Sequence, residues 1–156
     1  MSPKHASIPV SIRELLERRG IHYNIKGKNV ESAIKNAVHD IRLPAEIPEK
    51  AVTTSLLQRE EMMPTAVGKG IAFPHPRNPI ISDATSECLA LCFLQHKIDY
   101  RALDGEPVDI LFVIISSNSK RHLEILSKIS FLCQQKDFLK LLHDRQNEQA
   151  ILSYIE

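Results

Sequence analysis

The stretch Cys88–Leu94 reads CLALCFL, and Val108–Ile115 reads VDILFVII. Both are continuously apolar apart from Asp109, as is typical of central strands that are covered on both faces. Between them, Leu103–Pro107 (LDGEP) has the composition of a turn. The two runs therefore predict the middle of a sheet that has helices packed on both of its faces.

Segments on either side of these runs have the periodicity of helices and of one edge strand. The strand is predicted over residues 21–25, and helices over 12–18, 30–41, 48–60, 120–134, 137–143 and 147–155. Ser11 and Asn29 precede two of these helices as N-caps. In the helix over 120–134, the side chains expected to face the core are Leu123, Leu126, Ile129, Ser130 and Cys133. The fold class is therefore α/β or α+β, with one sheet in a single domain.

Length and composition support one globular domain. The chain has 156 residues, 43% of them hydrophobic and 25% charged, which excludes wholesale disorder. We expect a flexible leader over residues 1–10 and the domain over 11–156.

A net charge of +1 provides no electrostatic footprint for nucleic acid, and no apolar run is long enough to span a membrane. The chain lacks a secretory signal, and its three cysteines are too few for a disulfide framework, so a reducing, cytoplasmic location is expected.

The sharpest local feature is Gly68–His75, which reads GKGIAFPH. A glycine-broken loop leads into a short apolar strand, and a proline then places His75 at its end. A histidine in such a position can act as a base, a metal ligand or a nucleophile. It can equally be a turn residue that only forms a hydrogen bond with its own loop, so the pattern alone leaves the role of His75 open.

Three other residues could bind an anion beside such a histidine. His122 falls in the first turn of a predicted helix, where free backbone N–H groups and the helix dipole attract anions and disfavour the imidazolium form. Arg59 ends another helix, and it can either complement the helix dipole or clamp a phosphoryl group with two donors. Thr65 offers a hydroxyl group, although a turn residue beside Pro64 needs no further role. His122 could likewise be an ordinary solvated residue.

Other chemistries find less support in the sequence. The spacing of Gly68 and Gly70 does not match a nucleotide-binding loop. No cysteine–histidine pair has the spacing of a zinc site, and we therefore expect neither a metal nor another cofactor.

Four sequence blocks together resemble the type 2 enzyme IIA domain of the bacterial phosphoenolpyruvate-dependent phosphotransferase system. This is the fructose/mannitol class, which includes a nitrogen-regulatory member. The resemblance extends from about Ile12 to Ile155. The blocks are Leu57–Glu60 (LQRE), Pro64–His75 (PTAVGKGIAFPH), Leu103–Asp109 (LDGEPVD) and His122–Leu126 (HLEIL).

The resemblance implies a mixed sheet with helices on both faces, and it implies a role for each candidate residue. By motif position, His75 is the phosphorylated residue, His122 is its partner histidine and Arg59 is the charged clamp, with Thr65 a further candidate for phosphoryl binding. The sequence departs from the family at Pro76, where a glycine is usual. Proline removes one N–H donor and holds φ at about −65°, so the rate of transfer and the fit to a partner are open at this position.

The partners implied by the resemblance are the small phosphocarrier HPr or its nitrogen-branch relative. Three functions are compatible with the sequence. We expect a nitrogen-regulatory enzyme IIA that binds regulatory target proteins according to its phosphorylation state. A sugar-specific enzyme IIA would instead pass the phosphoryl group to a cysteine of a IIB subunit. A binding module without phosphotransfer is the third possibility. None of the three requires nucleic acid or insertion into a membrane.

Overall fold

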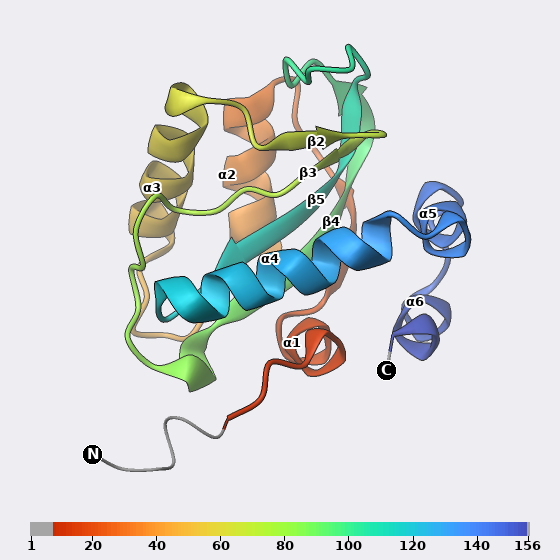
Figure 1. The fold of residues 1–156 in the computed structure, drawn as a ribbon. Helices are drawn as coiled ribbons and strands as arrows, with labels where there is room; N and C mark the ends of the chain where they lie inside the picture. The colour runs from red at the N-terminus through yellow and green to blue at the C-terminus, as the bar shows by residue number, and fades with distance from the viewer. Residues whose placement is uncertain (1–7, 156) are drawn as a thin grey trace.

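The protein has one mixed five-stranded sheet, as the computed structural model, which describes residues 8–155, shows in Figure 1. The strands are β1 (Ile21–Ile25), β2 (Ala66–Gly68), β3 (Ile71–Ala72), β4 (Cys88–Ile98) and β5 (Val108–Ile115). Their order is β1-β4-β5-β3-β2, in which β1 is parallel to β4, β4 antiparallel to β5, β3 parallel to β5 and β2 antiparallel to β3. The two apolar runs are therefore the adjacent inner strands β4 and β5, as predicted.

Helices cover both faces of the sheet, which confirms the predicted fold class. They are α1 (Ile12–Arg19), α2 (Val30–Asp40), α3 (Glu49–Met62), α4 (Ser119–Cys133), α5 (Lys136–His143) and α6 (Glu148–Tyr154), with a short 3₁₀ helix η2 at Ala84–Ser86. Figure 1 shows α2 and α3 on one side of the sheet and α1, α4, α5 and α6 on the other. None of the helices between residues 8 and 155 is long and apolar enough to cross a bilayer.

The hydrophobic core has two halves because successive side chains of a strand point to opposite faces. In β4, Leu91 and Phe93 pack on the side of α1 and α4, whereas Ala90 and Cys92 pack on the side of α2 and α3. All four are fully buried. A strand that is buried on both faces has no reason to alternate polar and apolar residues, which explains its continuously apolar sequence.

Local signals define the helix ends. The Ser11 hydroxyl accepts a hydrogen bond from the Glu14 amide at the start of α1, and the Asn29 side chain accepts one from the Ser32 amide at the start of α2. Gly20 ends α1 with a φ of 98°, a conformation that a residue with a Cβ rarely adopts. Both predicted N-caps are therefore confirmed.

One predicted inner face is wrong. Leu123 was expected to face the core, yet it is 64% exposed, while Ile125 is fully buried together with Ile129. The sequence of α4 has more apolar residues than one face can hold, so helical spacing alone allows two orientations. The way in which α4 packs on β5 and α1 selects between them and leaves Leu123 on the surface.

The segment predicted as a broken loop before His75 contains a hairpin. Its turn, between β2 and β3, uses positive φ angles at Gly68 (94°), Lys69 (59°) and Gly70 (80°). The Lys69 amide donates a hydrogen bond of 2.9 Å to the carboxylate of Asp104, and this bond helps to hold the pKa of Asp104 below its ordinary value. Two of the sequence blocks, GKGIAFPH and LDGEPVD, therefore meet in space and fix the hairpin that leads to His75.

The predicted leader, residues 1–10, lies largely outside the described residues. The structure describes only its last part, residues 8–10. There Val10 is buried in the core, and its carbonyl accepts a hydrogen bond from Lys128 of α4. This part of the segment is therefore packed against the domain, and the domain boundary remains a prediction.

Candidate functional site

His75 lies just beyond β3, in an extended segment held on both sides by backbone hydrogen bonds. The Ile114 amide of β5 donates to the Pro74 carbonyl at 2.9 Å, and the Phe73 amide donates to the Thr65 carbonyl at 3.0 Å. The Nδ1 atom of His75 lies 2.7 Å from the Phe73 carbonyl. Because a carbonyl oxygen can only accept, Nδ1 carries the proton, and Nε2 therefore has the free lone pair.

His122 approaches from the other side, in the first turn of α4. The centroids of the two imidazole rings are 4.8 Å apart, with an angle of 40° between the ring planes. The Nδ1 atom of His122 lies 3.4 Å from the Ser116 hydroxyl, at the end of β5. The fold thus brings together two histidines that are 47 positions apart in the sequence, as the resemblance implied.

Both histidines favour the neutral form. Burial is the main cause that lowers the pKa of His75 below its ordinary value, and the nearby Arg59 guanidinium lowers it further. The hydrogen bond to Phe73 and the carboxylate of Glu60 act in the opposite direction. Burial also lowers the pKa of His122, and the electrostatic influence of His75 and of Arg59 lowers it further. A neutral imidazole retains the lone pair that a nucleophile requires.

Arg59 lies in the last turn of α3, close enough to influence both histidines electrostatically. One of its terminal nitrogens donates a hydrogen bond of 2.7 Å to the Met63 carbonyl, which anchors the side chain. A guanidinium has five N–H donors and keeps its charge at all relevant pH values. Arg59 can therefore hold its position through one donor and present others to an anion.

Thr65 is placed differently from the other candidates. Its amide and its hydroxyl both donate to the carboxylate of Glu60, the amide at 2.9 Å, and only 6% of the residue is exposed. In this arrangement its hydroxyl is directed to Glu60. Glu60 itself, together with the carbonyl of Phe73, was missed as a site residue by the sequence reasoning. The only signal was its place beside Arg59 in the block LQRE.

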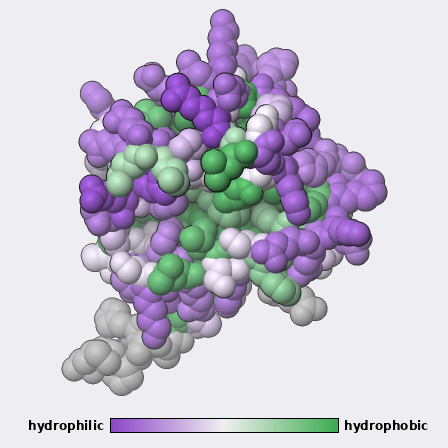
Figure 2. Space-filling model, turned by 45° about the horizontal axis from the view of Figure 1, so that its top comes forward, coloured by the Kyte–Doolittle hydropathy of each residue, from purple (hydrophilic) through white to green (hydrophobic). Residues whose placement is uncertain are grey.

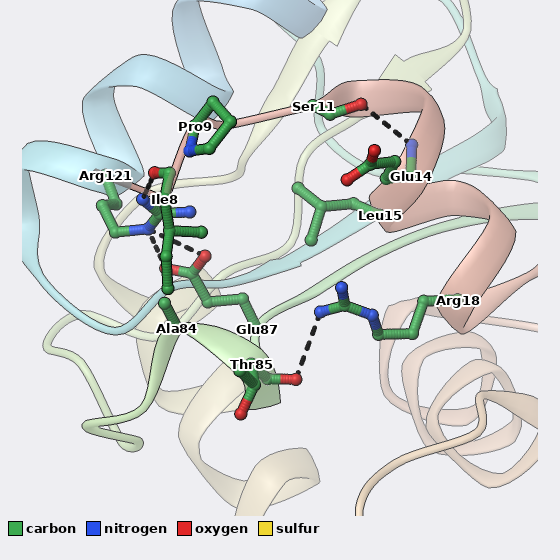
Figure 3. Close-up of a pocket in the computed structure, with 10 residues that line it drawn as sticks. All are labelled: Ile8, Pro9, Ser11, Glu14, Leu15, Arg18, Ala84, Thr85, Glu87 and Arg121. Carbon is green, nitrogen blue, oxygen red and sulfur yellow. Dashed lines mark hydrogen bonds and ion pairs between the residues drawn. The ribbon is translucent and has the colours of Figure 1, made fainter. Parts of the chain in front are cut away.

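A buried ion pair supports the loop that precedes His122. Glu87 is fully buried and accepts hydrogen bonds from the amide and the hydroxyl of Ser117 and from Nε of Arg121, at 2.8–2.9 Å. Figure 3 shows Arg121 between this carboxylate and the Ile8 carbonyl, to which it donates at 2.7 Å. The pocket drawn there lies between α1 and η2. The hydrogen bonds of Glu87 with Ser117 and Arg121, beside this pocket, hold the first turn of α4 in place.

The surface near the histidines has exposed apolar side chains. Met62 and Met63 follow Arg59 at the end of α3, and Leu123 follows His122. All three are more than half exposed. Figure 2 shows apolar side chains in the middle of one face of the molecule, surrounded by hydrophilic ones.

Within residues 8–155, no three histidine, cysteine or acidic side chains come together as a metal-binding group.

Comparisons with known proteins show the family to which the chain belongs. Residues 14–156 match the family described as "Phosphoenolpyruvate-dependent sugar phosphotransferase system, EIIA 2". The chain therefore belongs to the type 2 enzyme IIA family of this phosphotransferase system. Membership of the family supports a role in phosphoryl transfer.

The relatives include both sugar-specific and regulatory proteins. The chain is 30% identical over 151 residues to the fructose-specific EIIABC component of Bacillus subtilis, covering 94% of the chain but 23% of that protein. It is 35% identical over 109 residues to the nitrogen regulatory protein of Bradyrhizobium diazoefficiens, covering 69% of each. The chain thus spans about a quarter of the fructose-specific protein and about two thirds of the regulatory protein.

Solved structures share the fold. The nitrogen regulatory protein IIA-Ntr of Neisseria meningitidis superposes with a TM-score of 0.69 at 25% identity, covering 84% of this chain and 89% of that one. The mannitol enzyme IIA of Escherichia coli, solved in complex with its phosphorylated enzyme IIB, superposes with a TM-score of 0.66 at 14% identity, covering 93% and 95% of the two chains. At that identity the second likeness shows the fold alone.

Proposed function

We propose that this chain is a phosphocarrier of the nitrogen-regulatory type, which accepts a phosphoryl group on Nε2 of His75 from phospho-HPr or its nitrogen-branch relative. The observation that carries the proposal is the closeness of two histidines: the ring centroids of His75 and His122 are 4.8 Å apart. The Phe73 carbonyl accepts a hydrogen bond from Nδ1 of His75. That hydrogen bond leaves Nε2 as the nucleophile, with His122 beside the ring and Arg59 near enough to lower its pKa.

In the proposed reaction, the lone pair of Nε2 forms the new N–P bond as the N–P bond of the donor breaks, and its electron pair stays on the donor nitrogen. The charge of the transferring group spreads over its three outer oxygens, so positioning and electrostatics supply most of the catalysis. Arg59 and the positive end of the α4 helix dipole would stabilise that charge. Thr65 would contribute a hydroxyl only if it released Glu60.

His122 is suited to sense the transferred charge. In the free protein its pKa is lowered by burial, by His75 and by Arg59. A phosphoryl group on His75 would place a charge of about −2 beside it, which favours a protonated imidazole. His122 would therefore gain a proton, or at least a stronger hydrogen bond, as the phosphoryl group arrives.

The direct test supplies phosphoenolpyruvate, enzyme I and HPr, or the nitrogen-branch equivalents of the last two, to the purified chain. The expected result is a mass increase of one phosphoryl group that is lost in acid and maps to the peptide containing His75. NMR of the labelled ring should place the phosphorus on Nε2. Label on any other residue, or no label with either set of donors, would refute the proposal.

The second candidate function is that of a sugar-specific enzyme IIA. It is favoured by the match to the fructose-specific protein of Bacillus subtilis over 94% of the chain, and the mannitol enzyme IIA that shares the fold binds a IIB partner. The phosphorylated chain can be mixed with a fructose-type or mannitol-type IIB domain. Efficient loss of the label to the IIB cysteine would favour this function over the regulatory one.

The acceptance of phosphoryl groups should depend on pH through His75. Because burial lowers its pKa below the ordinary value of 6.5, the ring stays neutral down to a lower pH than a free histidine does. The rate should therefore be constant around neutral pH and fall only as the pH drops through the lowered pKa, below 6.5. Single-turnover rates and an NMR titration of the ring should give the same midpoint; a midpoint above 6.5 would contradict the expectation.

A further inference from the structure

Glu60 has an unusual set of contacts for a residue that no reaction step uses. It lies in the last turn of α3, beside Arg59, and its carboxylate accepts three hydrogen bonds. One oxygen accepts from the Thr65 amide at 2.9 Å, and the other accepts from the Thr65 hydroxyl and from the Tyr100 hydroxyl, the latter at 2.7 Å. Each donor comes from outside the helix, so the carboxylate joins α3 to two other segments of the chain.

The contact with Thr65 leads directly to the nucleophile. Glu60 holds the amide of Thr65, and the carbonyl of the same residue accepts the hydrogen bond from the Phe73 amide at 3.0 Å. The Phe73 carbonyl in turn accepts the proton on Nδ1 of His75 at 2.7 Å. Two backbone positions thus connect the carboxylate to the imidazole, and no flexible side chain lies between them.

Tyr100 donates the third hydrogen bond to the Glu60 carboxylate. It is 1% exposed, and burial raises the pKa of its hydroxyl far above the ordinary value, so the hydroxyl always carries its proton. Its ring belongs to the core on the side of α2 and α3, and its hydroxyl donates to Glu60. A carboxylate that is held by three donors has little freedom to rotate, and it therefore provides a rigid anchor for Thr65.

We propose that Glu60 is a positioning residue for phosphoryl acceptance: by anchoring Thr65, it holds the Phe73 carbonyl where that oxygen fixes the ring orientation and the Nδ1-protonated tautomer of His75. The inference rests on the proposed function, since it concerns the geometry of that nucleophile. Its physical basis is the sensitivity of transfer reactions to small displacements, because a misplacement of about 1 Å can cost about 100-fold in rate.

Glu60 also carries a negative charge that raises the pKa of His75, opposite to the effect of Arg59 and of burial. A charge effect and a positioning effect must therefore be separated. Two substitutions do this. Glu60→Gln removes the charge but retains an oxygen for the Thr65 amide and an NH₂ group for the two hydroxyl oxygens. Glu60→Asp retains the charge but is shorter by one methylene group, so it cannot keep all three contacts.

The experiment measures the rate of phosphoryl transfer from phospho-HPr or its nitrogen-branch equivalent to each variant, with ¹⁵N NMR of the His75 ring. We expect Glu60→Asp to lower the rate by about tenfold or more and to introduce a population of the Nε2-protonated tautomer. We expect Glu60→Gln to keep a rate close to that of the unmodified protein and the original tautomer, although the pKa of His75 falls. Glu61→Asp, an exposed neighbour on the same helix, is the matched control and should change neither quantity.

The outcomes separate this inference from the proposed function. If the unmodified chain is not phosphorylated on His75, the proposed function fails first. If it is phosphorylated but Glu60→Gln is slow while Glu60→Asp is not, the charge acts and the positioning role is refuted. Equal rates and tautomers in all variants would refute it as well. Thermal unfolding of each variant checks that a slow rate does not come from an unfolded protein.

Discussion

Replacement of His75 by alanine is expected to abolish phosphorylation completely, because it removes the only atom that the proposed reaction uses as a nucleophile. Replacement of His122 should have a different result. His122→Ala leaves Nε2 of His75 in place and removes a group that lies beside the transferring phosphoryl group. A loss of about 100-fold in rate, with the label still on His75, is the expected effect of removing one such stabilising group.

Single-turnover labelling followed by mass spectrometry measures both variants. His96→Ala is the matched control, since His96 is an exposed histidine at the end of β4, and it should be labelled like the unmodified protein. An acid-labile label that persists on the His75→Ala variant would contradict the assignment of the nucleophile. A His122→Ala variant that is labelled at the full rate would contradict the role of the second histidine.

The largest effect on stability is expected at Glu87. Its carboxylate is fully buried and pairs with Arg121, whose side chain is only 14% exposed. Glu87→Ala would leave the Arg121 guanidinium without a negative charge beside it and the Ser117 amide without its acceptor. Breaking a buried pair on one side costs about 3–5 kcal/mol, because the remaining charge stays buried. We therefore expect the free energy of unfolding to fall by that amount in a denaturant titration.

An exposed ion pair provides the control for this substitution. Lys140 and Asp144 form a bond of 2.8 Å on the surface of α5, with side chains 77% and 44% exposed. Asp144→Asn should change the free energy of unfolding by about 0.5 kcal/mol or less, because water screens such pairs. A loss below about 1 kcal/mol for Glu87→Ala would show that the buried network contributes less than its geometry indicates.

The two inner strands and the helix ends could be predicted from the sequence for local reasons. A continuously apolar run such as Cys88–Leu94 has few environments in which it is stable, and the middle of a covered sheet is one of them. Ser11 and Asn29 act as caps through bonds to amides three positions away, so the signal lies within one turn of chain. The hairpin strand Ala66–Gly68 could not be predicted in this way, because a strand of three residues that ends in a glycine is too short to show a period.

The candidate site was predicted in part. His75 and His122 each stood in a position typical of anion chemistry, and a family resemblance linked them. Glu60 was not predicted as a site residue, since a glutamate near the end of a helix is usually an exposed side chain. Its contacts with Thr65 and Tyr100 involve segments 5 and 40 positions away, and the second of these has no local signature.

Local chemistry along the chain was enough to establish the two inner strands, the caps of the first two helices and the histidine that follows a short apolar strand. The distance between the two imidazoles, the protonated nitrogen of His75 and the outward orientation of Leu123 emerged only once β3, β5 and α4 had packed together. The reason is that an apolar period or a cap depends on neighbours within a few residues. The residues of a site, in contrast, come from helices and strands that are far apart in the sequence. The geometry of the site depends on the packing and hydrogen bonds that join β3 and β5 to α3 and α4.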